Sequence, residues 1–185
     1  MNLILPFVNI FLALVMILGQ VLVVFTIILF FFHRNKPDHF DRWSGKYLGF
    51  IHKYILGIGF IITLGATVFS LFYSDIIGFA PCKLCWIQRV FIYPQVLIFG
   101  LALIRKDRKI IDYSVVLTIV GLIFSFYHNY LYFLPTENIP CDASGVSCTA
   151  NYVNEFGYIT IPVMTLTAFM MTLVALLVDR VYKKD

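Results

Sequence analysis

The chain has 185 residues, of which 61% are hydrophobic and only 13% are charged, and its net charge is +4. A water-soluble domain normally carries about 25% charged residues, so this composition excludes an ordinary soluble globular protein. We expect lipid to form part of the solvent, and the length allows one compact bundle without a second globular domain.

Five apolar stretches are each long enough to cross a membrane. About 20 helical residues suffice, because the hydrocarbon core is about 30 Å thick and a helix rises about 1.5 Å per residue. In chain order the stretches cover roughly Phe7–Phe32, Tyr47–Phe72, Trp86–Ile104, Tyr113–Leu134 and Ile159–Val178. The first is too long for the apolar core of a signal peptide and no basic residue precedes it, so we expect it to be retained. The sequence therefore predicts an all-α integral membrane protein.

The basic residues predict how these helices are oriented. Twelve of the fourteen Lys and Arg residues lie between the first two helices and into the second, in the turn after the third, or in the C-terminal tail. The positive-inside rule makes that side cytoplasmic, with the C-terminus. The N-terminus and the loops Tyr73–Cys85 and Pro135–Tyr158 are then outside. Topology and anionic membrane lipid explain the positive charge, so nucleic-acid binding is not expected.

The second outer loop contains a further pattern. In the stretch Asn151–Tyr158, the side chains of Tyr152, Val153 and Phe156 would share one face of a helix. This spacing predicts a short helix that lies on the membrane surface.

All four cysteines lie in the two outer loops, at Cys82, Cys85, Cys141 and Cys148. The outside of the membrane is where disulfides form and persist. Four cysteines allow three pairings, and spacing along the sequence favours Cys82 with Cys85 and Cys141 with Cys148.

The Cys82–Cys85 pair is a Cys-x-x-Cys motif at the expected start of the third helix. Free N–H groups and the positive end of the helix dipole stabilise a thiolate at that position. Lys83 adds positive charge, and a disulfide in so small a ring is readily opened. These features favour a redox role over an inert structural disulfide or one half of a metal site.

The Cys141–Cys148 pair encloses a polar loop with Ser144 and Gly145 in its middle, which another protein could reach. The alternative is a structural disulfide that pins a long loop. Two dithiols on one face of a membrane can exchange electrons in series, which favours the redox interpretation.

Polar residues inside the third and fourth helices indicate a site near these cysteines. Arg89 follows Cys85 by one helical turn on the same face, and Gln88 precedes it. An arginine inside the apolar layer is costly unless it lines a polar cavity or meets a partner; the alternative is a side chain that extends to the outer headgroups. His128 lies at nearly the same depth in the fourth helix, and could instead be an ordinary buried histidine.

These residues resemble a known family. The pattern Pro81-Cys82-x-x-Cys85-Trp86-x-Gln88-Arg89, followed by Tyr93-Pro94, is similar to the disulfide bond formation protein B (DsbB) family, and closest to its compact BdbC-like branch. The segment from Cys141-x-x-x-Gly145-x-x-Cys148 to Pro162 is similar as well. The resemblance covers roughly Ile51 to Val178.

The resemblance implies a four-helix transmembrane bundle in a bacterial cell membrane that supports disulfide bond formation. Cys141 and Cys148 would accept electrons from a thioredoxin-like, DsbA-type partner, and Cys82 and Cys85 would pass them to a quinone, either ubiquinone or menaquinone. Arg89 matches the quinone-side arginine, and His128 stands in the place of a quinone-side polar residue. Residues 47–185 would form the redox bundle, whereas 1–46 add a helix and a cytoplasmic loop that depart from the family pattern.

Three alternatives remain open at the level of sequence. A vitamin K epoxide reductase-like enzyme also combines helices, two dithiols and a quinone, but its loop cysteines precede the Cys-x-x-Cys. Four thiolates could hold a soft metal, although an oxidising exterior works against free thiols. The last alternative is a non-enzymatic scaffold with two structural disulfides.

Overall fold

The structure is a computed structural model that describes residues 4–35, 41–134 and 147–182. Within these ranges it holds no β-strand, and its long helices are α1 (Ile4–Asn35), α2 (Asp41–Leu71), α3 (Lys83–Arg105), α4 (Ile111–Phe133) and α5 (Ile161–Tyr182). All five are long and apolar enough to cross a membrane. A π-helix, η1 (Phe72–Ile76), extends α2, and a short 3-10 helix, η2 (Arg108–Ile110), precedes α4. The predicted all-α membrane fold is confirmed.

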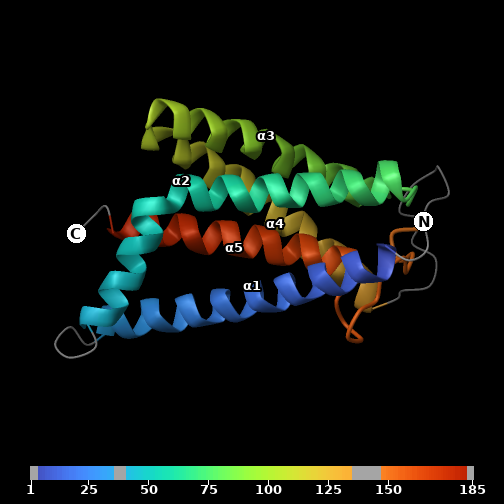
Figure 1. The fold of residues 1–185 in the computed structure, drawn as a ribbon, viewed down its shortest axis with the longest axis horizontal. Coiled ribbons are helices and arrows are strands. Elements are labelled where there is room, and N and C mark those ends of the chain that lie inside the picture. The colour runs from blue at the N-terminus through green and yellow to red at the C-terminus, as the bar shows by residue number, and fades with distance from the viewer. Residues whose placement is uncertain (1–3, 36–40, 135–146, 183–185) are drawn as a thin grey trace.

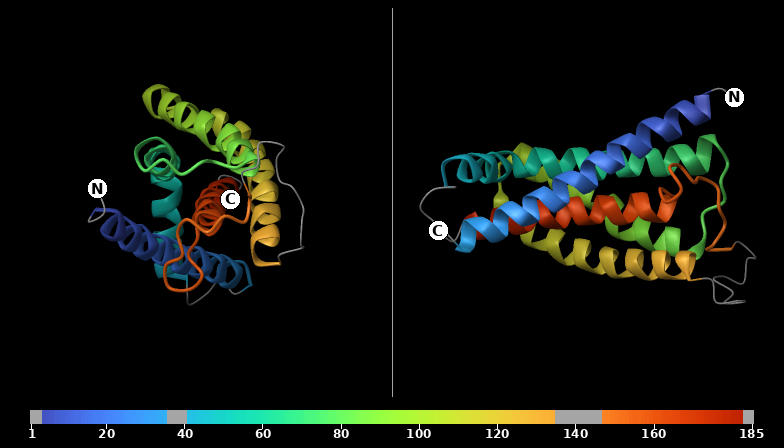
Figure 2. Two further views of the ribbon diagram at one scale, coloured as in Figure 1. Left: turned by 90° about the vertical axis from the view of Figure 1, so that its right-hand side faces the viewer. Right: turned by 90° about the horizontal axis from the view of Figure 1, so that it is seen from below.

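Four of the helices form a closed bundle. Helices α2 and α4 each pack against both α3 and α5. Helix α1 packs mainly against α5 and to a lesser extent against α2, so it lies along the outside of the bundle (Figure 1; Figure 2, left). The structure therefore has the expected four-helix bundle with one extra N-terminal helix.

Two glycines allow neighbouring helices to come into close contact. A Cβ atom built at Gly59 of α2 would lie 2.5 Å from the Phe99 ring of α3. A Cβ atom at Gly121 of α4 would overlap the Phe169 ring of α5. Because neither ring can move aside without disturbing the packed core, these glycines set how closely the helices approach.

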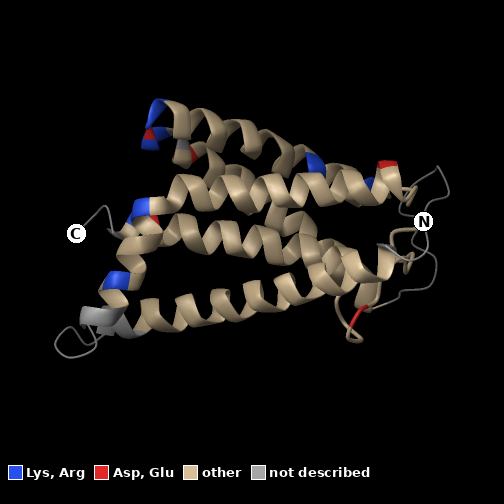
Figure 3. Ribbon diagram, in the orientation of Figure 1, with Lys and Arg blue, Asp and Glu red and all other residues tan. Residues whose placement is uncertain are grey.

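The charged residues distinguish the two ends of the bundle. Figure 3 shows that Lys and Arg gather where α2 begins, where α3 passes into η2 and where α5 ends. At that end the buried Asp179 of α5 lies 2.9 Å from Nδ1 of His52 and accepts a hydrogen bond from Arg108 at 3.4 Å. The contacts tie α2, η2 and α5 together opposite the end where α3 begins.

Two details differ from the sequence prediction. Helix α2 begins at Asp41, so the 46/47 boundary lies inside a continuous helix. Its 31 residues exceed the length needed to cross the membrane, and Figure 1 shows its first turns crossing the end of the bundle before the helix runs along it. The predicted surface helix at Asn151–Tyr158 is wrong. Phe156 and Gly157 have φ angles of 52° and 78°, and Glu155 pairs with Ile159, so this segment is a tight turn.

Candidate functional site

The Cys-x-x-Cys motif starts α3. Cys82 is the residue that caps this helix, in extended conformation, and its Sγ accepts a hydrogen bond from the backbone N–H of Cys85 at 3.4 Å. A sulfur thus takes the place of the Ser or Asp oxygen that commonly caps a helix, at the positive end of the dipole. Both thiols are free, and their Sγ atoms are 3.0 Å apart, within hydrogen-bond range.

His128 of α4 connects this motif to the loop that contains Cys148. Its Nε2 lies 3.8 Å from Cys82 Sγ and 3.1 Å from the carbonyl oxygen of Cys148. Its Nδ1 lies 3.2 Å from Nε2 of Gln88. With the Gln88 amide nitrogen as donor, Nδ1 is the acceptor and Nε2 carries the proton that faces the carbonyl and the sulfur. The histidine is buried, and its ring is held on both sides.

These contacts favour a thiolate at Cys82. The hydrogen bond from the Cys85 thiol lowers the pKa of Cys82 far below the ordinary thiol range, and the hydrogen bond from His128 lowers it further, although burial acts in the opposite direction. The thiolate is the form of cysteine that attacks a disulfide or is released from one. The pair can therefore exchange electrons at neutral pH.

Arg89 lies one turn beyond Cys85 in α3, but it bonds to α2. Its Nε donates to Ser70 Oγ at 3.0 Å, and its Nη2 donates to the Ser70 carbonyl oxygen at 3.1 Å. The guanidinium also lies 5.0 Å from the centre of the Trp86 ring. Ser70 thus fixes the position of the arginine one helical turn from Cys85.

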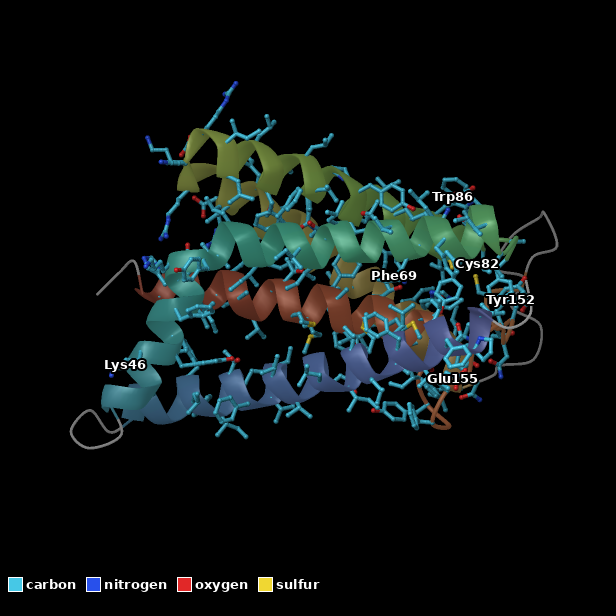
Figure 4. All side chains as sticks on the ribbon, in the orientation of Figure 1. Lys46, Phe69, Cys82, Trp86, Tyr152 and Glu155 are labelled. Atoms are coloured by element: carbon cyan, nitrogen blue, oxygen red, sulfur yellow. The ribbon has the colours of Figure 1, made fainter. Side chains whose placement is uncertain are left out.

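A pocket brings these groups together. It is lined by six polar or sulfur-bearing residues that were predicted as site residues, namely Cys82, Cys85, Gln88, Arg89, His128 and Cys148. Its remaining walls are mainly apolar and come from α1, α2 and α5 as well as α3. Figure 4 shows Cys82, Phe69 and Tyr152 at this end of the bundle, opposite Lys46. The pocket is thus apolar, with a few donors and two thiols.

Of the second cysteine pair, the structure describes only Cys148. Cys148 is disulfide-bonded, is buried and packs in one cluster with Cys82, Leu84 and Leu131. Cys141 lies outside the described residues. The structure therefore brings one member of the second predicted pair against the first pair.

Some pocket residues were missed by the sequence analysis. Ser70 gave no signal, because a single serine in an apolar helix is common. The π-helix η1 places Tyr73 in the pocket, where its ring stacks on Phe79, which stacks in turn on Tyr152 with a centroid separation of 4.7 Å. This row of rings joins the two loops that carry the cysteines.

Comparisons with known proteins agree on a family. The family model described as "Disulfide bond formation protein DsbB" matches residues 52–178, more than half of the chain. A protein of Bacillus anthracis named "Probable disulfide formation protein C 2" is 36% identical over 72% of this chain and 96% of its own length. The "Disulfide bond formation protein C" of Bacillus subtilis is 39% identical over 62% of this chain and 83% of its own length.

No solved structure matches the chain. The family match nevertheless covers most of the bundle, including Cys82, Cys85 and Cys148. The chain therefore belongs to the DsbB family, and it is a multi-pass bacterial membrane protein with an oxidoreductase role in disulfide bond formation.

Proposed function

We propose that this protein is a membrane thiol:quinone oxidoreductase that reoxidises a thioredoxin-like, DsbA-type partner outside the cytoplasm. The observation that carries the proposal is a single apolar pocket in which Cys82, Cys85, Arg89 and His128 meet. The cysteine end of the bundle faces the exterior, and the basic end with the C-terminus faces the cytoplasm. The redox bundle comprises α2 to α5, so it begins at Asp41 rather than at residue 47, and α1 is added to it.

The residues of the pocket fit a quinone. A quinone ring is flat and apolar with two carbonyl oxygens, and natural quinones carry an apolar tail. The guanidinium of Arg89 and the amide of Gln88 offer hydrogen-bond donors for the carbonyls, and His128 holds that amide in place through its Nδ1. The remaining walls are mainly apolar. A bound quinone would supply the oxidising power, since it accepts two electrons and two protons and leaves as a quinol.

Electrons enter at the second cysteine pair. A thiolate of the reduced partner attacks the Cys141–Cys148 disulfide and forms a mixed disulfide, and one of these two cysteines leaves as a thiolate. The second partner thiol then displaces the remaining cysteine, so the partner is oxidised and the Cys141–Cys148 pair is reduced. Each exchange breaks one S–S bond and forms another.

The reduced pair then opens the Cys82–Cys85 disulfide by the same chemistry. The close packing of Cys148 and Cys82 supports this order. His128 and the Cys85 thiol stabilise the thiolate on Cys82, while Arg89 lies beyond Cys85. When the Cys82–Cys85 disulfide forms again, the pair gives up two electrons to the acceptor in the pocket, and the Cys85 thiol gives up one proton. Because Cys82 is already a thiolate, the second proton that the acceptor needs comes from water.

A purified enzyme tests the scheme. The protein in detergent is mixed with a reduced thioredoxin-like protein and decylubiquinone, and the loss of quinone absorbance is followed. We expect Cys85→Ser to abolish quinone reduction, while the variant still oxidises about one equivalent of the thiol protein through the second pair. If Cys85→Ser reduces quinone at the wild-type rate, the scheme is wrong.

A further inference from the structure

Helix α1 supplies part of the wall of the pocket. Leu12 and Met16 line the same pocket as Cys82 and Arg89. The two side chains are four residues apart, so they share one face of α1. Leu12 is buried and Met16 is half-buried, whereas Leu18, two residues beyond Met16, is 59% exposed on the side away from the bundle.

Polar contacts hold this wall in position. The hydroxyl of Tyr73, which also lines the pocket, donates to Asn9 Oδ1 of α1 at 2.8 Å. Farther along α1, Gln20 Nε2 donates to Thr167 Oγ1 of α5 at 3.1 Å. Hydrogen bonds between helices in the apolar layer fix their rotation, so the same face of α1 remains turned toward the pocket.

The wall comes from a part of the chain that the family match does not include. That match begins at residue 52, within α2, and the whole of α1 precedes it. The sulfurs, the arginine and the histidine all lie inside the matched residues. The chemistry of the site thus belongs to the shared bundle, whereas one apolar side of the pocket belongs to the added helix.

We propose that Leu12 and Met16 contact the apolar part of the quinone and determine which quinones fit, an inference that rests on the proposed function. If the quinone carbonyls face the donors on α3, the rest of the ring and the start of the tail face the apolar walls. Leu12 is branched and Met16 is flexible, so together they would distinguish quinones by the shape of the apolar part. One or two methylene groups of misfit change binding about tenfold or more.

Quinone binding by variants of Met16 tests this assignment. Binding of decylubiquinone and of menadione to the full-length protein in detergent is measured by isothermal titration calorimetry, without any thiol substrate. We expect Met16→Trp to raise the Kd for decylubiquinone about tenfold or more, because the indole fills the space beside the ring. The matched control Leu18→Trp, on the outer face of α1, should bind like the wild type.

A second readout separates this proposal from the proposed function. Stoichiometric oxidation of a reduced thioredoxin-like protein in the absence of quinone should proceed equally in the wild type and in Met16→Trp. Equal quinone Kd values for Met16→Trp and wild type would overturn the role of α1 and leave the oxidoreductase scheme in place. A wild-type protein that binds neither quinone would overturn both.

A variant with a smaller side chain tests the assignment even if the tryptophan variant misfolds. Met16→Ala enlarges the pocket, so we expect the ratio of the Kd values for menadione and decylubiquinone to change about threefold or more. Leu18→Ala should leave that ratio unchanged. An unchanged ratio in Met16→Ala would overturn the assignment, whatever the tryptophan variant does.

Discussion

The reactivity of Cys82 arises from its neighbours. The Cys85 thiol and His128 stabilise its thiolate at the end of α3. Because its pKa in the folded protein is depressed, the thiolate stabilises the reduced fold most strongly above the ordinary thiol pKa. That contribution is lost as the pH falls through the depressed value.

Alkylation of the reduced protein should show this shift. Between pH 8.5 and pH 5.5 an ordinary thiol loses about a thousandfold of its reactivity, as its thiolate fraction falls. We expect the rate at Cys82 with iodoacetamide to fall less than about tenfold over that range. Site-resolved mass spectrometry measures the rate. His128→Phe should steepen the dependence, and a thousandfold loss in the wild type would contradict a stabilised thiolate.

Arg89 depends on Ser70 for its position. Ser70→Ala removes the Oγ that accepts from Arg89 Nε and from the Tyr93 hydroxyl, and leaves only the backbone carbonyl. Hydrogen bonds to charged groups contribute about 1.5–3 kcal/mol, so we expect the KM for quinone to rise about tenfold. The rate of thiol exchange should not change.

Steady-state assays with varied quinone and varied thiol protein separate these effects. The control Ser114→Ala makes the same change in α4, at a buried serine that does not line the pocket. An unchanged quinone KM in Ser70→Ala would mean that Arg89 needs no such support.

At the level of the helices, close packing predicts a contrast between two glycines of α2. A Cβ at Gly59 would meet the Phe99 ring, whereas one at Gly57 would meet nothing within 4 Å. We expect Gly59→Ala to be less stable than Gly57→Ala by about 1–3 kcal/mol, because the added methyl group would overpack the core beside Phe99. Unfolding in a detergent and denaturant series measures the difference. Equal stabilities would show that α2 and α3 can separate at no cost.

The number and order of the helices could be predicted from the sequence, because the length of an apolar stretch limits what can cross a bilayer. The start of α2 at Asp41 could not, since the polar residues there carry no apolar pattern. The spacing of three apolar residues predicts a helix at Asn151–Tyr158, but the chain turns there instead. Gly157 has a positive φ, which is incompatible with a continuing α-helix.

The site was predicted where its residues are close in sequence. Cys82, Cys85, Gln88 and Arg89 lie within two turns of one helix, so their proximity follows from helical spacing. The contacts of Arg89 with Ser70 and of His128 with Cys82 join different helices. They depend on helix rotation and packing, which composition and spacing do not define. The contribution of α1 to the pocket was missed for the same reason.

At the scale of the whole molecule, we expect the Cys82–Cys85 end of the bundle to face the outside of the cell. Disulfide formation by this route requires it, because an oxidised partner persists only in an oxidising compartment. Asp75 is exposed at the cysteine end and Lys106 is exposed at the basic end. A single cysteine at either position, with the native cysteines replaced by serine, reports its own side of the membrane.

Labelling with a membrane-impermeant maleimide makes the most direct measurement. In intact cells stripped of any outer barrier, we expect Asp75→Cys to react and Lys106→Cys to remain unlabelled until the membrane is permeabilised. The reverse pattern, with Lys106→Cys labelled and Asp75→Cys protected in intact cells, would place positions 82 and 85 on the cytoplasmic side and contradict the proposed orientation.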